Sequence, residues 1–405
     1  MAGKLQPNFR SELLYKRLEY PNRLFLIGLL LFISHYCVAQ DVVKIVVNPY
    51  ELPSGECKLS DLAESIEYIP LETNDKCLIG KVSDFDISEK YIVVYCYKSQ
   101  SIYLFHRNGR LISKIGSYGE GPGEYVVISG LLIDEKRKRI IIFDGYKRKQ
   151  LNYDLSGKCT SAISIESEVG RYRRLHNDHF FIITKNYNGN VPFAYEIRDI
   201  NLKLISENIK TVYYERRGSG VTMLGIPAHY LYNDKIHTKE ISLNDTIYSI
   251  EKDYSYKPKY AINAGRYEVT TDVRAAFDDF FRLLEVHVTF RNFFETKEKL
   301  LIFYNFGKTV PYYCYYDSSN QKLLYFKSKK GIPNNYDGGL DFWPERQDNQ
   351  YWYAFYDAHI FEDELAEKKK ETLKGDSKSI QSFNNLMKKL DPDDNPVLMI
   401  VKIKE

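Results

Sequence analysis

The chain has 405 residues, of which 44% are apolar and 27% charged, as in ordinary folded globular proteins. Tyrosine is the unusual residue: 35 copies, with 22 phenylalanines, favour strands over helices. Without residues 1–39, which carry five basic and two acidic side chains, the totals of 57 basic and 54 acidic residues fall to 52 each. This neutrality argues against a nucleic-acid partner, which would need a large basic field.

The first 39 residues have the pattern of an export signal. An apolar run at 24–33 follows a net-positive stretch, and a small residue, Ala39, ends the segment. We therefore predict a signal peptide at 1–39, cleaved after Ala39, and a single domain at 40–405 that is exported to the periplasm or cell surface. A retained N-terminal anchor is the alternative, and only then would the protein associate with a membrane. The apolar run is shorter than the roughly 20 residues that span a bilayer.

Five cysteines remain after cleavage, too few and too scattered for a disulfide framework. We expect isolated buried thiols, with a Cys57–Cys77 disulfide as the alternative. No Cys-x-x-Cys pair occurs, which excludes a zinc ribbon.

An internal repeat follows in the first half of the predicted domain. Residues 92–115 and 140–163 align without a gap at an offset of 48, each with an apolar strand, a polar turn, a second strand, a tight turn and a third strand. Gly109 and Gly157 occupy the tight turn, where a positive φ is needed. A weaker third copy spans 180–205, with Asn201 expected in the position of the glycine.

Further strands follow with less regularity. They are expected at 235–239, 245–250, 257–262, 284–291, 299–304, 311–317, 322–327, 351–356 and 397–403, with short helical insertions near 271–284 and 361–390. Units of this size predict an all-β fold, a six-bladed β-propeller of four-stranded antiparallel blades. Pairing of residues 66–69 with the C-terminal strand would close the last blade. A two-sheet sandwich is the competing fold, but it does not explain the offset of 48.

Two sets of segments carry a resemblance to known families. Residues 115–125, 131–134, 141–144 and 152–157 resemble the NHL-type propeller repeat. The turn at 119–125, together with 68–73, 78–80, 244–248, 337–344 and 394–399, resembles the uncharacterised exported six-bladed β-propeller family of Gram-negative bacteria. The resemblance implies the fold and export, and no activity. Many members of that family appear lipid-anchored, whereas residues 34–36 before Cys37 lack the lipoprotein pattern.

The glycine-rich segment 116–124 invites comparison with nucleotide-binding loops. Glu124 stands where a dinucleotide fingerprint needs glycine, and no Lys-Ser/Thr pair follows for a phosphate loop. We expect Gly119, Gly121 and Gly123 to form a structural turn between blades. Glu124 and Tyr125 remain candidate ligand-binding residues at the ligand end of the propeller.

Two further segments supply candidate ligand-binding residues. Asp337, Asp341 and Trp343 place two carboxylates and an indole on a glycine-containing loop, suited to sugars or peptides. The alternative is a structural loop with Trp343 packed between blades. Arg171 and Arg173 could recognise a carboxylate or phosphate, and the alternative is a solvated strand face.

The sequence favours an exported binding or interaction module. The expected ligand is a glycan or peptide on one face of the ring, with no cofactor and no metal, and no catalytic residue can be assigned. One alternative is a propeller hydrolase of the metal-dependent lactonase kind, with a metal in the channel held by residues of separate blades. A second is a structural partner in an envelope complex. A fold alone does not decide among them.

Overall fold

The computed structural model describes residues 42–166, 170–175, 178–184, 193–209, 228–239, 246–270, 272–273, 285–307, 311–326, 331–366 and 372–405. Residues Val42–Glu405 form one compact unit. The predicted signal peptide at 1–39 lies outside the described residues, as does nearly all of the predicted helix at 271–284.

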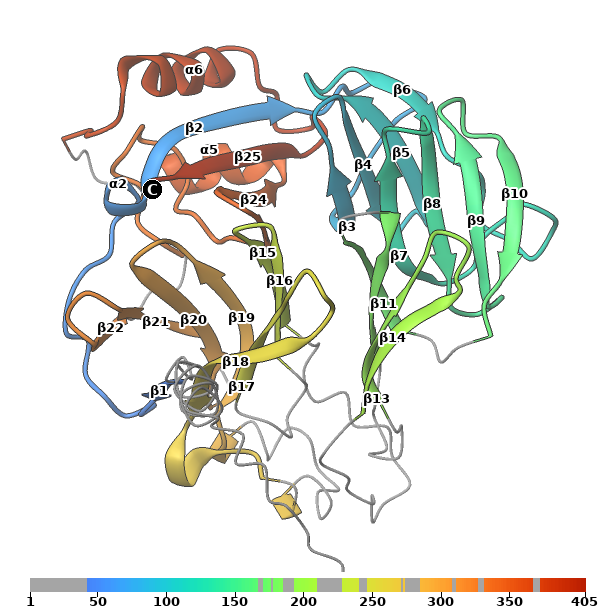
Figure 1. Ribbon diagram of the computed structural model, residues 1–405. Coiled ribbons are helices and arrows are strands. Elements are labelled where there is room, and N and C mark those ends of the chain that lie inside the picture. The colour runs from blue at the N-terminus through green and yellow to red at the C-terminus, as the bar shows by residue number, and fades with distance from the viewer. Residues whose placement is uncertain are drawn as a thin grey trace, which may run out of the picture. The chain divides into compact units, whose positions relative to one another are not determined.

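The protein is mainly β, and its strands form four-stranded antiparallel blades in a β-propeller arrangement (Figure 1). Four blades are separate sheets. The first has β3 (Val82–Ile87), β4 (Tyr91–Cys96), β5 (Ser101–His106) and β6 (Leu111–Lys114); the second has β7 (Ile128–Asp134), β8 (Arg139–Asp144), β9 (Lys149–Asp154) and β10 (Cys159–Ser164). The third has β11 (Gly170–Arg174), β12 (Phe180–Thr184), β13 (Phe193–Arg198) and β14 (Leu204–Ile209); the fourth has β19 (Thr289–Glu295), β20 (Lys299–Asn305), β21 (Pro311–Asp317) and β22 (Lys322–Phe326).

A nine-stranded sheet contains two more antiparallel sets of four strands. One set is β15 (Ala228–Tyr232), β16 (Lys235–Lys239), β17 (Thr246–Ile250) and β18 (Tyr256–Asn263); the other is β23 (Arg346–Asp348), β24 (Tyr351–Tyr356), β25 (Val397–Ile403) and β2 (Ala63–Pro70). A single parallel pair, Leu231 with Asp348, joins β15 to β23. The ninth strand, β1 (Val43–Val46), runs parallel to β18.

The first strand of each blade is the inner one. Inner strand β7 packs against inner strands β3 and β11, and β15 packs against β19 and β23. Gly130 on β7 permits one of these approaches, because a Cβ atom there would lie 2.7 Å from the Cβ atom of Tyr172 on β11. Side chains of β3, β11, β15 and β23 are thereby brought together.

The 48-residue repeat reappears as equivalent contacts between blades. Gly109 (φ 85°) and Gly157 (φ 88°) lie in matching turns, and a Cβ at either would lie 2.0–2.1 Å from a backbone oxygen of the preceding blade, Pro70 or Lys114. The assignment of Asn201 to the corresponding position of the third copy was wrong: Leu202 has the positive φ, 67°. Its side chain is buried in the core between blades, and this burial offsets the cost of the left-handed backbone.

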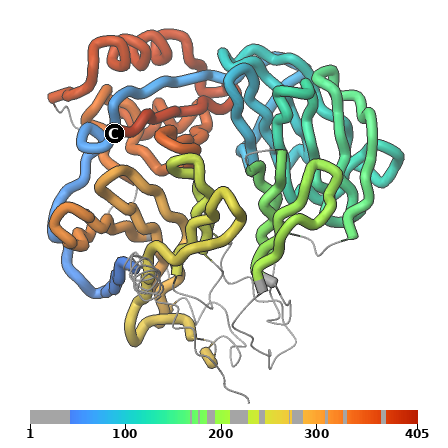
Figure 2. The backbone as a smooth tube through the Cα atoms, viewed as in Figure 1, coloured from blue at the N-terminus to red at the C-terminus, as the bar shows by residue number. Residues whose placement is uncertain are grey.

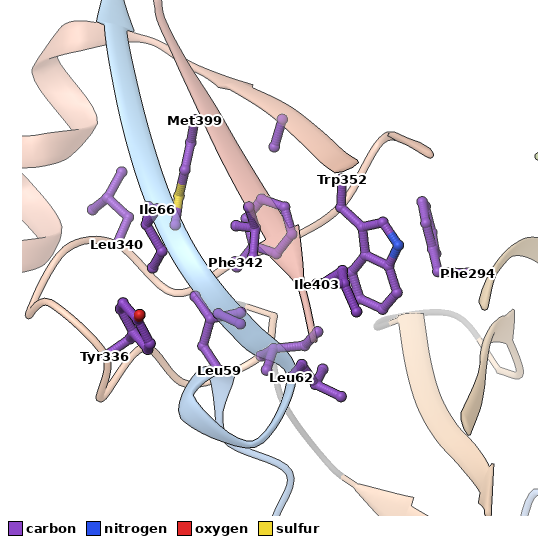
Figure 3. Close-up of a cluster of buried hydrophobic side chains, with 14 of the residues drawn as sticks. Leu59, Leu62, Ile66, Phe294, Tyr336, Leu340, Phe342, Trp352, Met399 and Ile403 are labelled. Carbon is purple, nitrogen blue, oxygen red and sulfur yellow. The ribbon is translucent and has the colours of Figure 1, made fainter. Parts of the chain in front are cut away.

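The N-terminal and C-terminal parts of the unit meet in one blade, as predicted. β2 pairs antiparallel with β25 from Ala63 to Pro70, and Figure 2 shows the two segments side by side. A core of apolar side chains forms around this pair (Figure 3); it includes Leu59, Leu62, Ile66, Leu340, Phe342, Trp352, Met399 and Ile403.

The predicted helical insertion at 361–390 contains two helices, α5 (Ala358–Ala366) and α6 (Ser377–Met387). Asp376 begins α6 because its carboxylate accepts a hydrogen bond from the Ser379 backbone N–H, 2.9 Å away. Helix α6 packs on β2, where Ile66 N–H donates to Ser379 Oγ at 3.2 Å.

Some local predictions need correction. The strand predicted at 284–291 begins only at Thr289, and the three-residue strand β23 was not predicted. A short helix, α2 (Leu59–Leu62), and a 3-10 turn, η3 (Gly265–Tyr267), complete the elements in the described ranges. Cys57 and Cys77 are free thiols, so the alternative disulfide is absent. Within the described part of the chain, none of the helices has the length and apolar character needed to cross a bilayer.

Candidate functional site

Charged and polar side chains from four inner strands meet in one place, which we call the inner-strand cluster: Asp84 and Asp86 (β3), Arg173 (β11), His229 (β15) and Arg346 (β23). Arg346 is its centre. Its Nη2 donates to Asp84 Oδ1 at 2.9 Å, its Nη1 lies 3.5 Å from Asp86 Oδ1, and its guanidinium stacks on the Phe85 ring with a centroid distance of 4.3 Å. It also donates to the Phe85 carbonyl oxygen.

Arg173 completes the cluster from the other side. Its Nε donates to His229 Nε2 at 2.5 Å, and its Nη1 donates to the Tyr172 carbonyl oxygen at 2.9 Å. Its Nη2 is 3.9 Å from Asp84 Oδ1. Asp84 therefore lies between two arginines, and the three side chains are mostly shielded from solvent.

Burial, attraction between opposite charges and repulsion between the arginines together set the pKa values of this cluster. Burial alone would raise the pKa of Asp84, but Arg173, Arg346 and Arg171 together lower it. Burial raises the pKa of Asp86 despite Arg346. For Arg173, burial and the nearby Arg346 lower the pKa to about 10. Of the two β3 carboxyl groups, Asp84 is thus the more firmly ionised.

The glycine loop, residues 116–125, is held by a lysine of the next blade. Lys147 Nζ donates to the carbonyl oxygens of Glu120, Gly121 and Glu124 at 3.1, 2.7 and 3.0 Å. The Glu124 carboxylate accepts from the Gly121 backbone N–H at 2.8 Å and from Ser117 Oγ at 3.3 Å. The loop therefore presents carbonyl oxygens to the Lys147 ammonium group. It does not present a row of N–H donors, as a phosphate-binding loop would.

The other predicted residues of this loop are also in structural contacts. Tyr125 is fully buried, and its hydroxyl donates to the Gln100 carbonyl oxygen at 3.1 Å. Gly119 and Gly123 have positive φ, whereas Gly121 does not. The backbone and the buried face of the loop are therefore fixed, and only its outward side chains are available for contacts.

Three outward tyrosines surround this loop, and we call them the tyrosine surface: Tyr97, Tyr118 and Tyr146. Their exposed fractions are 69%, 50% and 61%. Tyr97 lies on the turn 97–100 and Tyr146 on the turn 145–148. The hydrogen bonds of Tyr125 and Lys147 tie both turns to the glycine loop, which contains Tyr118, so the backbone segments that carry the three rings are connected.

The predicted loop with two carboxylates and an indole is mostly internal. Asp337 is 2% exposed, and its Oδ1 accepts from Asn334 Nδ2 at 2.7 Å and from Tyr68 Oη at 3.2 Å. Asp341 accepts from the Asn334 backbone N–H at 3.0 Å, and Trp343 packs edge-on against Phe303, with ring centroids 4.9 Å apart. The loop therefore packs between β2, β24 and β20 and has a structural role.

The structure thus places the predicted site residues in three separate groups. Arg171 and Arg173 share β11, Glu124 and Tyr125 share the glycine loop, and Asp337, Asp341 and Trp343 share the 331–345 loop. Sequence reasoning missed the remaining cluster members and the tyrosine surface. The alternating polar residues of Val82–Ile87 were a signal for Asp84 and Asp86, since they share one strand face. Among the described residues, no three His, Cys, Asp or Glu side chains gather as a possible metal site.

The chain is similar to several solved structures and to one family model. A Bacteroides fragilis protein that is thought to be exported is 16% identical, with a TM-score of 0.64, and the alignment covers 90% of this chain and 100% of that one. A DUF4221 family member from Bacteroides vulgatus is 10% identical, covering 85% of this chain and 97% of its own, with a TM-score of 0.49. A streptogramin B lyase is 12% identical, covering 66% and 88%, with a TM-score of 0.34. None of the curated proteins matches the chain. A model described as a domain of unknown function, DUF4934, matches residues 41–402, and the chain therefore belongs to the DUF4934 family.

Proposed function

We propose that this protein is an exported six-bladed propeller, of the NHL-like kind, that binds glycans through the tyrosine surface. Six antiparallel sets of four strands support the blade number: four separate sheets and two within the nine-stranded sheet. The export pattern at 1–39 and the likeness to a protein thought to be exported support the location.

The observation that carries the binding proposal is the exposure of three tyrosines on a rigid support. Large aromatic side chains are normally at least half buried, and a group of exposed ones commonly marks an interaction site. Tyrosine rings offer an apolar face to the C–H face of a sugar and a hydroxyl to its polar edge. Lys98, Glu120 and Arg148 are exposed on the same turns and can accept or donate to sugar hydroxyls.

The test is a glycan array followed by calorimetry, using protein purified after expression of the full chain. Tyr118→Ser and Tyr146→Ser should each weaken binding of the best glycan about tenfold, the equivalent of 1.4 kcal/mol. Both variants should keep the melting temperature, because the exposed rings contribute little to the core.

Tyr351→Ser is the matched control, because Tyr351 is also solvent-exposed but lies on β24, in another blade. It should bind like the unaltered protein. Binding of a peptide library with no glycan binding, or equal loss of affinity in all three variants, would contradict the proposal.

A further inference from the structure

Arg171, the second residue of β11, differs from Arg173 and Arg346, the two arginines of the inner-strand cluster. Arg171 and Arg173 are two residues apart on a strand and so project to the same side, while Tyr172 between them stacks on Phe143 with ring centroids 3.7 Å apart. Arg173 and Arg346 have hydrogen-bond partners. In the part of the chain that the structure describes, the Arg171 guanidinium has neither a hydrogen bond nor an ion pair.

The position of Arg171 is fixed although its side chain is free. Gly170 precedes it, and a Cβ there would lie 2.5 Å from the Ile183 carbonyl oxygen, so the backbone of β11 is pressed against β12. The Arg171 backbone is in register with Ile183. Arg171, a partly exposed residue, therefore has a fixed backbone, which lowers the entropy lost when a ligand binds.

The carboxyl groups near Arg171 are already engaged by other groups of the chain. Asp84 and Asp86 are both engaged by Arg346, and Asp86 also accepts from the Ile133 backbone N–H at 2.8 Å. Asp348 adds a third carboxyl group beside Asp86 and Arg346, so the arginines near Asp84 face three carboxyl groups in all. A singly charged carboxylate is repelled less by these carboxyl groups than a doubly charged oxyanion is, and it would give the Arg171 guanidinium the anionic partner that the described residues do not supply.

We propose that Arg171, together with Arg173, is the binding site for a carboxylate group of a ligand on the inner strands. A guanidinium presents two parallel N–H donors to a carboxylate, and this geometry gives specificity over an uncharged amide. The site lies on β11, whereas the tyrosine surface lies on two turns and the glycine loop, and the site does not depend on the proposed glycan binding.

Labelling of arginines with phenylglyoxal, read by mass spectrometry of the purified full-chain product, tests this proposal residue by residue. Arg171 should react faster than Arg173 and Arg346, whose nitrogens are engaged. Millimolar N-acetylglycine should protect Arg171, and N-acetylglycinamide, which lacks only the negative charge, should not. Protection by the amide to the same degree, or stronger protection by inorganic phosphate than by N-acetylglycine, would overturn the assignment to a carboxylate.

Substitution of Arg171 provides a second test of the proposal. Arg171→Gln should abolish binding of N-acetylglycine in NMR titrations with no change in melting temperature, and Arg171→Lys should retain weak binding because it keeps the charge without the paired donors. Arg110→Gln is the control, since it removes the same charge from an exposed turn of another blade. Unchanged binding by Arg171→Gln, or equal loss in Arg110→Gln, would overturn the proposal. The labelling result stands even where a variant fails to fold.

Discussion

Asp348, on the short strand β23, shows how a single partly buried carboxyl group links stability to pH. Burial, followed by repulsion from Asp86, raises its pKa from 3.8 to about 6. In the unfolded chain the same group ionises near its ordinary value. Between these two values the folded state binds more protons than the unfolded state, so this group makes the free energy of unfolding fall as the pH rises.

Asp348→Asn should therefore stabilise the protein at neutral pH. The free energy of unfolding of the variant should exceed that of the unaltered protein only slightly near pH 4. The difference should grow as the pH rises to about 6 and stay constant above it. Urea unfolding of both proteins across this range measures the difference. The contributions of other groups cancel in it, including that of His237, whose pKa burial lowers to about 3. Asp393→Asn removes a carboxylate from an exposed turn and serves as the control. An advantage that does not change with pH would refute this explanation.

Gly130 carries a second residue-scale prediction, because β7 and β11 can approach only while this position lacks a side chain. A Cβ atom would meet Tyr172 Cβ at 2.7 Å and Phe143 Cδ2 at 3.1 Å. Gly130→Ala should lower the free energy of unfolding by about 1–3 kcal/mol, the usual cost of overpacking. Gly55→Ala should be nearly neutral, since the nearest atoms to its Cβ would be 3.9 Å away. Equal chemical denaturation midpoints for the two variants would show that β11 can move away freely.

At the scale of elements, the glycine loop depends on one lysine for its shape. Lys147→Met keeps much of the side-chain volume but removes three charge-assisted hydrogen bonds to loop carbonyls. We expect the free energy of unfolding to fall by about 1.5–3 kcal/mol, and glycan affinity to fall because Tyr118 and Tyr146 lose their shared support. Hydrogen exchange should increase in residues 116–125. Lys149→Met, an exposed lysine on β9, is the control, and the prediction fails if both variants exchange alike.

Local patterns explain which elements could be predicted. The strands of the first two blades follow from their pattern of apolar and polar residues. The turns at Gly109 and Gly157 follow from the need for a positive φ, and both signals lie within a few neighbouring residues. The pairing of β2 with β25 could be predicted because a propeller must remove its open edges. β23 could not, since three residues are too few for a periodic signal.

The candidate site was harder to predict than the fold because its members are far apart in sequence. Arg346 and Asp84 are 262 positions apart, and their contact depends on how the blades are placed. Arg171 and Arg173 were recognisable as a basic segment. That Arg173 has partners and Arg171 has none among the described residues depends on His229 and Asp84, which come from other blades. The sequence could not single out the tyrosine surface, because tyrosines are common throughout the chain. Only the structure shows that Tyr118 is exposed and Tyr125 buried.

At the scale of the whole unit, residues 42–58 form an N-terminal strap that connects three groups of strands. β1 pairs with β18, the Ser54 backbone N–H donates to the Tyr325 carbonyl oxygen on β22 at 3.1 Å, and the Leu59 N–H donates to the Pro333 carbonyl oxygen at 2.9 Å. The strap reaches β2 through α2, and β2 closes the last blade. It therefore links the outer edges of two blades to the closing strand.

Loosening this strap should destabilise the blades that it joins before the rest of the unit. Ile45 and Val47 are 2% and 0% exposed, whereas Val46 between them is 58% exposed. The double variant Ile45→Ala/Val47→Ala should lower the free energy of unfolding by about 3–5 kcal/mol through lost burial and cavity formation, and Val46→Ala should change it by less than about 0.5 kcal/mol. In hydrogen exchange, β17 and β18 should lose protection in the double variant while β8 and β9, which the strap does not contact, keep theirs. Uniform loss of protection across all blades would mean that the unit unfolds as one block and that the strap has no local role.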